Sequence, residues 1–192
     1  MSALAPQVRR WTREEYRKMV EYRLFAPEER VELIEGEVVE MSPKRSPHST
    51  ATTLVGDALR LAFGRGHTVR IQEPLALSPT SEPEPDVAVV KGTPRDYRDE
   101  HPSTALLIVE VSESSLPYDR TTKASLYAKS SIPEYWVVNL LDDQLEIHRG
   151  PSPRVDQPFG YGYTTVFVYG ASDVVSPLAA PDRPIAVADL LP

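Results

Sequence analysis

The hydrophobic and polar positions of the chain predict short strands interrupted by two long amphipathic helices. The first helix is expected over residues 47–63, because Ser46 and Pro47 suit an N-cap and a first helical position and Gly64 suits its end. Its apolar face is predicted to consist of Leu54, Ala58, Leu61 and Ala62. The second helix is expected over residues 118–129, so a run of strands must separate the two helices.

Blocks rich in valine, isoleucine and aromatic residues, which are typical of β-strands, lie between and after these helices. The predicted strands cover residues 68–72 with 75–77, 86–90, 105–111, 134–140, 144–149 and 163–169. Asp142 and Asp143 are expected to turn the chain between two of them, and the prolines and glycines that follow Gly150 predict a loop. Strands punctuated by two long helices favour an α/β fold, in the form of an α+β sandwich, over a β-barrel.

The N-terminal part of the chain carries signals for a short helix and a hairpin. Thr12, with Glu15 three positions later, predicts a capping box that opens a helix running to about Tyr22. A hairpin is expected next, because Gly36 supplies the positive φ of a tight turn. Its two strands are predicted over residues 31–34 and 37–41.

The composition is that of an ordinary globular protein of 192 residues, of which 41% are hydrophobic and 26% are charged. This length suits one sizeable core. We therefore expect a single domain over residues 1–192, with a core at about 30–149 and a proline-rich C-terminal extension at 150–192. No apolar run approaches the roughly 18 residues that a membrane helix needs, and residues 1–10 lack the apolar stretch of a signal peptide. A cytoplasmic protein is the expectation.

Two further features restrict the chemistry. The chain has no cysteine, which excludes disulfides, thiolate zinc sites and a cysteine nucleophile, and its 4 histidines are far apart, which argues against a histidine-rich metal site. The net charge of -7 counts against a protein that coats nucleic acid nonspecifically. A cleavage site is compatible with this charge, because it collects carboxylates for a metal while basic residues cluster locally.

The candidate chemistry lies in two acidic residues of neighbouring strands. Asp86 opens one apolar strand and Glu110 stands near the end of the next, so an antiparallel pairing brings both to one edge of the sheet. A carboxylate in so apolar a strand is costly to ionise unless something pairs with it. A divalent cation with a preference for oxygen ligands, Mg²⁺ or Mn²⁺, is one such partner. The alternative is a structural salt bridge between Glu110 and Lys123.

Lys123 is the third candidate residue. It shares a helical stripe with Asp119 and Tyr127, and the loop that precedes the helix is short enough for its side chain to reach Glu110. Its ammonium would there orient a water and balance charge on the phosphate. The alternative is a surface pair between Lys123 and Asp119, and for Tyr127 a core position is favoured.

An ordered set of short motifs resembles the Uma-type family of putative restriction endonucleases, within the PD-(D/E)xK nuclease superfamily. The motifs are Glu32-Leu33-Ile34-Glu35-Gly36-Glu37, Met41-Ser42-Pro43, His48, Glu84-Pro85-Asp86, Ile108-Val109-Glu110-Val111-Ser112, Asp119, Lys123 and Pro133-Glu134-Tyr135-Trp136. The resemblance covers about residues 30–141. It implies a core of helix, three strands, helix and strand, with the acidic residues at one sheet edge.

The resemblance also implies roles for individual residues. Asp86 and Glu110 match the acidic positions of the family and would bind Mg²⁺, for which Mn²⁺ would substitute. The usual lysine of the superfamily would fall at Ser112, and Lys123 matches the position in the following helix where this family carries its lysine instead. Two further residues match family positions near the site, His48 and Glu32. Each would contact the phosphate or hold a water that is bound to the metal. Alternatively, His48 is an exposed residue of a first helical turn and Glu32 belongs to the polar face of its strand.

Together these features predict a Mg²⁺-dependent endonuclease that hydrolyses DNA phosphodiester bonds, with nucleic acid as its partner. A homodimer is expected on general grounds only, because soluble oligomers are commonly symmetric and two strands have to be cut. The first alternative is a non-catalytic binding or scaffolding module with the same fold, which the acidic charge and the serine at position 112 favour. The second is a metal-dependent hydrolase of small nucleotides.

Overall fold

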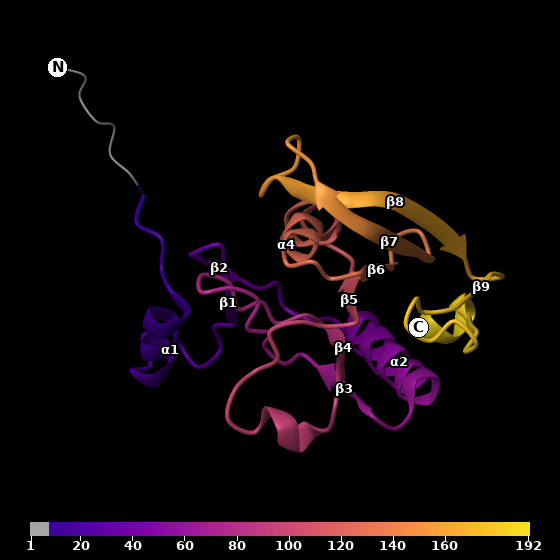
Figure 1. Cartoon of the computed structure of the whole chain (residues 1–192), viewed down its shortest axis with the longest axis horizontal. Coiled ribbons are helices and arrows are strands. Elements are labelled where there is room, and N and C mark those ends of the chain that lie inside the picture. Colours follow the sequence, from indigo (N-terminus) through magenta and orange to yellow (C-terminus); the bar gives the residue numbers. More distant parts are fainter. Residues whose placement is uncertain (1–7) are drawn as a thin grey trace.

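The computed structural model describes residues 8–192 and contains a six-stranded mixed sheet with helices packed against it (Figure 1). The strands lie in the spatial order β3 (His67–Ile71), β4 (Val87–Lys91), β5 (Leu107–Ser112), β6 (Glu134–Asn139), β7 (Gln144–Pro153) and β8 (Tyr161–Gly170). Neighbouring strands are antiparallel except β5 and β6, which are parallel and therefore need a crossover. This arrangement confirms the predicted α/β fold.

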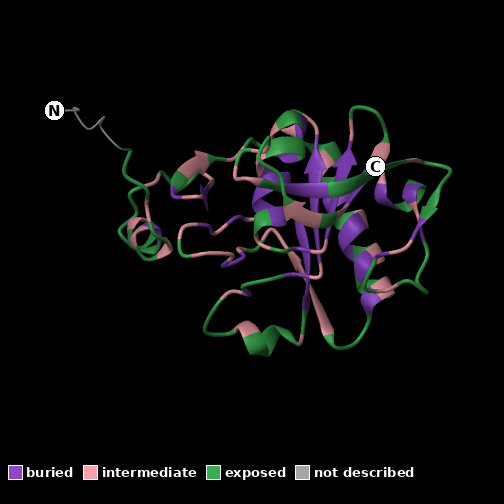
Figure 2. Cartoon of the chain, turned by 45° about the horizontal axis from the view of Figure 1, so that its top comes forward, coloured by how far each residue is buried: buried purple, intermediate pink, exposed green. Residues whose placement is uncertain are grey.

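The sheet separates two hydrophobic cores because alternate residues of its strands point to opposite faces. On one face, β4 and β5 pack against helix α2 (Ser46–Phe63) and against the C-terminal segment. On the other face they pack against the crossover between β5 and β6. Figure 1 shows α2 and the crossover helix on opposite sides of the sheet, and Figure 2 shows the buried strands between them.

Helix α2 corrects the predicted apolar face. Its buried apolar residues follow a spacing of four and are Ala51, Val55, Leu59 and Phe63. Ala58 and Ala62 pack at the margin of this stripe, whereas Leu61, which was expected in the core, is 83% exposed. Both stripes have helical periodicity, and only the position of the sheet decides which one is buried.

The N-terminal elements match the sequence signals. Helix α1 (Arg13–Glu21) begins with the capping box of Thr12 and Glu15. Strands β1 (Val31–Ile34) and β2 (Glu37–Glu40) form an antiparallel hairpin, and its turn has positive φ at Glu35 and Gly36. The hairpin is tied to the rest of the fold by backbone hydrogen bonds in both directions between Leu33 and Glu82.

The crossover after β5 is an interrupted helix instead of the single helix expected over residues 118–129. It consists of α3 (Leu116–Tyr118), a π-helical turn η2 (Asp119–Lys123) and α4 (Ala124–Lys129). The wider π-turn holds both of its end residues, Asp119 and Lys123, in buried positions. Such turns occur frequently at functional sites.

The C-terminal part of the chain continues the sheet where the prolines and glycines after Gly150 had predicted a loop. Strand β7 continues through Pro151 and Pro153, which pair with residues of β8 only, since pairing with β6 ends at Arg149. A proline is tolerated where no neighbour needs its missing N–H. Residues 75–77, predicted as strand, lie outside the strands. The remaining elements are η1 (Pro94–Tyr97), β9 (Val174–Val175), β10 (Ile185–Ala186) and η3 (Val187–Leu190).

Across residues 8–192, none of the helices combines the length and apolar character required to span a membrane.

Candidate active site

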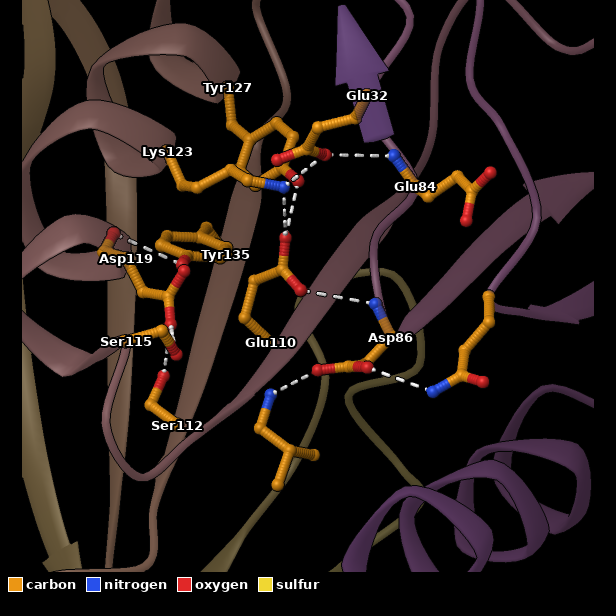
Figure 3. A network of polar contacts seen from close by, with 12 residues as sticks. Glu32, Glu84, Asp86, Glu110, Ser112, Ser115, Asp119, Lys123, Tyr127 and Tyr135 are labelled. Carbon is orange, nitrogen blue, oxygen red and sulfur yellow. Dashed lines mark hydrogen bonds and ion pairs between the residues drawn. The ribbon is translucent and has the colours of Figure 1, made fainter. Parts of the chain in front are cut away.

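Asp86 and Glu110 meet at one edge of the sheet, as the antiparallel arrangement of their strands predicted. Val87 of β4 lies opposite Val109 of β5. The backbone N–H of Asp86 donates to Glu110 Oε2 at 3.1 Å, and the N–H of Val111 donates to Asp86 Oδ2 at 2.9 Å. Each carboxylate is therefore fixed by the backbone of the strand that carries the other, as Figure 3 shows for Glu110 and Asp86.

Two side chains from other elements complete the surroundings of Asp86. His48, in the first turn of α2, lies with Nε2 3.1 Å from Asp86 Oδ2, and Gln72 donates from Nε2 to Oδ1 at 3.1 Å. Burial opposes ionisation of Asp86, but the hydrogen bond and charge of His48 and the donors from Val111 and Gln72 outweigh it and lower the pKa. The His48 side chain is 16% exposed, so this residue is not the freely exposed helix-end residue of the alternative prediction.

Lys123 lies between two carboxylates (Figure 3). Its Nζ donates to Glu32 Oε2 at 2.7 Å and to Glu110 Oε1 at 3.1 Å, and the side chains of all three are at most 7% exposed. Burial by itself lowers the pKa of Lys123, yet the charges of Glu110 and Glu32 raise it above its usual value. Lys123 is therefore a buried cation instead of a surface partner of Asp119, and Glu32 lies inside the protein instead of on a polar strand face.

Glu110 carries the largest conflict between burial and charge. Burial raises its pKa to about 8. The charge of Lys123 lowers this pKa, but the nearby carboxylates of Asp86, Asp119 and Glu32 raise it again. Tyr127 donates from its hydroxyl to Glu110 Oε1 at 2.6 Å. The protein thus surrounds Glu110 with donors but leaves an excess of negative charge around it.

Ser112, the position at which the superfamily usually has its lysine, has a different task here. Its hydroxyl donates to Asp119 Oδ2 at 2.7 Å, and the hydroxyl of Ser115 donates to the same atom at 2.6 Å. Asp119 is thereby held at the start of the π-turn, four residues before Lys123. The amine next to Glu110 comes from the helix and not from the strand.

A cavity of about 300 Å³ opens over these residues. Its charged lining is mainly acidic, with Glu32, Glu40, Asp86, Glu110, Glu113 and Asp119 against Arg30, Lys44, Arg45 and Lys123, and with His48 beside them. All five residues predicted for the site therefore line one pocket. Its walls come from the β1–β2 hairpin, the start of α2, the β4–β5 edge and the crossover helix.

The donor set at this pocket fits a magnesium ion. Within the described range 8–192, no group of three or more histidine, aspartate or glutamate side chains is arranged to hold a metal. Mg²⁺ usually takes only one or two carboxylates and keeps several waters, and Asp86 and Glu110 offer two adjacent carboxylates in the pocket wall. A divalent cation would also relieve the excess of negative charge around Glu110.

Two contacts of this site escaped the sequence interpretation. Tyr127 was assigned to the core, and its ring is fully buried there, but its hydroxyl reaches Glu110. The helical spacing of Tyr127 from Lys123 was a usable signal for this contact. Gln72 follows β3 with φ of 53° and turns toward Asp86, and no sequence pattern indicates that geometry.

Known proteins resemble this chain in sequence and in fold. The Uma2 family, described as "Putative restriction endonuclease", matches residues 13–187. A crystal structure of a putative nuclease belonging to DUF820 from Anabaena variabilis ATCC 29413 is similar with a TM-score of 0.68 and 14% sequence identity, over 93% of this chain and 96% of that chain. At this identity the similarity shows a shared fold. No curated protein matches the chain.

Proposed function

Because the chain belongs to the Uma2 family of putative restriction endonucleases, we propose that it is a Mg²⁺-dependent endonuclease that hydrolyses phosphodiester bonds of DNA. The observation that supports this proposal is the meeting of Asp86, Glu110 and Lys123 in one pocket. Two adjacent carboxylates and a fixed ammonium are the groups that phosphodiester hydrolysis needs for a metal and for developing negative charge.

In the proposed mechanism, Asp86 and Glu110 would hold the divalent cation, and the orientation of both carboxylates is set without it. Each carboxylate accepts a backbone N–H from the neighbouring strand, while His48 and Gln72 orient Asp86 and Tyr127 orients Glu110. When bound, the cation supplies Lewis-acid polarisation of the phosphate and lowers the pKa of the attacking water.

Lys123 supplies positive charge where the phosphate becomes more negative. Its ammonium is held by Glu32 and Glu110, so it needs little reorganisation when a phosphate oxygen reaches the pocket. In this mechanism Glu32 is a positioning residue that keeps Lys123 at the site, and it also accepts the backbone N–H of Glu84.

The experiment that tests the proposal is a DNA cleavage assay with Mg²⁺ for the wild type, Glu110→Gln and Glu146→Gln. Glu146 is a matched control, because it is also a buried glutamate of the sheet but lies outside the pocket. Glu110→Gln should lower cleavage at least about a hundredfold, the scale of losing a group that acts on transition-state charge. Glu146→Gln should cleave at the wild-type rate per folded molecule, with folding checked by near-ultraviolet circular dichroism.

Three results would contradict the proposal. Wild-type cleavage rates for Glu110→Gln would show that the pocket takes no part in the reaction. An inactive wild type, tested on duplex and single-stranded DNA with Mg²⁺ and Mn²⁺, would favour a non-catalytic binding module, and cleavage of free nucleotides alone would favour a small-nucleotide hydrolase.

A further inference from the structure

Lys44 is a cation at the wall of the pocket. It lies in the segment between β2 and α2 and is partly buried. The neighbouring basic residues of the wall are paired, Arg30 Nη2 with Glu84 at 3.1 Å and Arg45 Nη1 with Glu113 at 3.3 Å. Within residues 8–192, Lys44 forms no ion pair. Its ammonium is therefore open to an incoming anion.

Arg30, directly before the first strand of the hairpin, is a second basic residue of the same wall. Its Nη2 is bound to Glu84, but its Nη1 is buried and has no hydrogen-bond partner in the described part of the chain. A buried guanidinium N–H without a partner is costly, and a bound oxygen would satisfy it. Arg30 thus has a donor without a partner and lines the pocket together with Lys44.

The two cations also affect each other. Burial lowers the pKa of Lys44, and the positive charge of Arg30 lowers it further, although Asp86, Glu84 and Glu110 oppose the effect. Two like charges at one wall repel each other, and a phosphate placed between them would remove that repulsion and the desolvation penalty together. The first turn of α2 adds to the positive potential, since its N-cap, Arg45, provides no side-chain cap and no acidic residue lies in that turn.

We propose that Lys44 and Arg30 form a phosphate-binding subsite that holds the nucleic-acid backbone at the mouth of the pocket, beside Asp86 and Glu110. The inference rests on the proposed nuclease function and names residues that bind the substrate instead of cleaving it. A backbone phosphate is favoured over free phosphate because the subsite shares its pocket with the carboxylates and ammonium proposed for cleavage. The acidic lining repels an anion, so binding should require a divalent cation.

Lys44 is tested through the salt dependence of DNA binding, which does not depend on activity. The probe is a fluorescently labelled short DNA duplex, and its anisotropy is measured with Ca²⁺ at several salt concentrations for the wild type, Lys44→Gln, Lys44→Arg and Lys91→Gln. Each phosphate contact contributes a slope of about 0.9 in the plot of log affinity against log salt. Lys44→Gln should lose about one such contact, whereas Lys44→Arg should keep it.

Lys91→Gln is the matched control. This substitution also removes one positive charge. Lys91 is exposed, lies outside the pocket and is the last residue of β4, whereas Asp86 directly precedes the first residue of that strand. Its slope should equal that of the wild type. An unchanged slope for Lys44→Gln, or an equal loss for Lys91→Gln, would overturn the subsite while leaving the nuclease proposal intact.

Inorganic phosphate separates the two proposals if the wild type binds no DNA. Phosphate binding with Ca²⁺, measured by isothermal titration calorimetry, would then show whether the subsite exists without a polynucleotide. Binding that is lost in Lys44→Gln and kept in Lys91→Gln would support the subsite and refute its DNA ligand. No difference between the two variants would refute the subsite itself.

Discussion

Glu110 in β5 and Glu146 in β7 are two buried glutamates with opposite electrostatic surroundings. Both lie opposite Val137 of β6, one on either side, so they share a face of the sheet. Burial raises the pKa of Glu110 to about 8. Burial also opposes ionisation of Glu146, but the nearby His148 imidazole, hydrogen bonds from Arg120 and Asn139 and the charge of Arg120 lower its pKa to about 2.

The difference comes from the balance of charge around each carboxylate. Arg120 binds Glu146 in a forked geometry, with Nε 3.1 Å from Oε1 and 3.0 Å from Oε2 and with Nη2 2.5 Å from Oε1. Glu110 shares its one ammonium with Glu32. Burial therefore does not distinguish these two glutamates, whereas an excess of acid beside a cavity does and supports the functional role proposed for Glu110.

The largest effect is expected from Lys123→Met, which leaves Glu32 and Glu110 buried without their cation. Removing one partner of a buried ion pair costs about 3–5 kcal/mol of unfolding free energy, and urea denaturation measures it. Arg120→Met should cost less, because the Arg120 side chain is 43% exposed and water can replace part of its contact with Glu146.

A double variant sharpens this prediction. Lys123→Met leaves the carboxylates of Glu32 and Glu110 unpaired. Adding Glu110→Gln removes one of these two charges, so the double variant should be more stable than Lys123→Met alone. Equal losses for Lys123→Met and Arg120→Met, without recovery in the double variant, would mean that the two glutamates have equivalent surroundings.

Local signals in the sequence predicted the placement of much of this site. The capping box at Thr12, the hairpin turn at Gly36 and the strand order around Asp86 and Glu110 are set by nearby residues, and the structure confirms each of them. The antiparallel pairing was enough to place the two carboxylates at one edge, and the short loop before the helix was enough to predict that Lys123 reaches Glu110.

The features that the sequence did not reveal depend on tertiary contacts. Leu61 and Leu59 fit helical stripes equally well until the sheet buries Leu59. The π-turn at Lys123 has no signature in local propensity. Pro151 is tolerated in β7 because the pairing of β7 with β6 stops at Arg149, so that no β6 residue needs the missing N–H of the proline. Charge balance at Glu110 likewise depends on Glu32, which lies far away in the sequence.

A smaller effect is expected from Tyr127→Phe, which removes one donor from Glu110 without removing a charge. The loss of such a buried hydrogen bond costs about 1.5 kcal/mol, so DNA cleavage should fall roughly tenfold. Tyr135→Phe is the matched control, since Tyr135 packs against Tyr127 with ring centroids 5.1 Å apart but donates to the backbone carbonyl of Asp119. Similar cleavage by both variants would show that the Tyr127 hydroxyl does not position Glu110.

An effect confined to acid is expected at Glu146. Its folded-state pKa of about 2 lies below the ordinary value of 4.5, so the ionised form stabilises the fold above pH 4.5, and this contribution is lost as the pH falls from 4.5 to about 2. Urea denaturation across that window should show the stability advantage of the wild type over Glu146→Gln shrinking, by on the order of 1–2 kcal/mol after solvent screening.

Glu14→Gln, which breaks an exposed helical pair with Lys18, should show little pH-dependent difference from the wild type. An advantage of the wild type over Glu146→Gln that stays constant through this window would mean that Arg120 does not hold Glu146 ionised, and the electrostatic contrast between Glu146 and Glu110 would then be wrong.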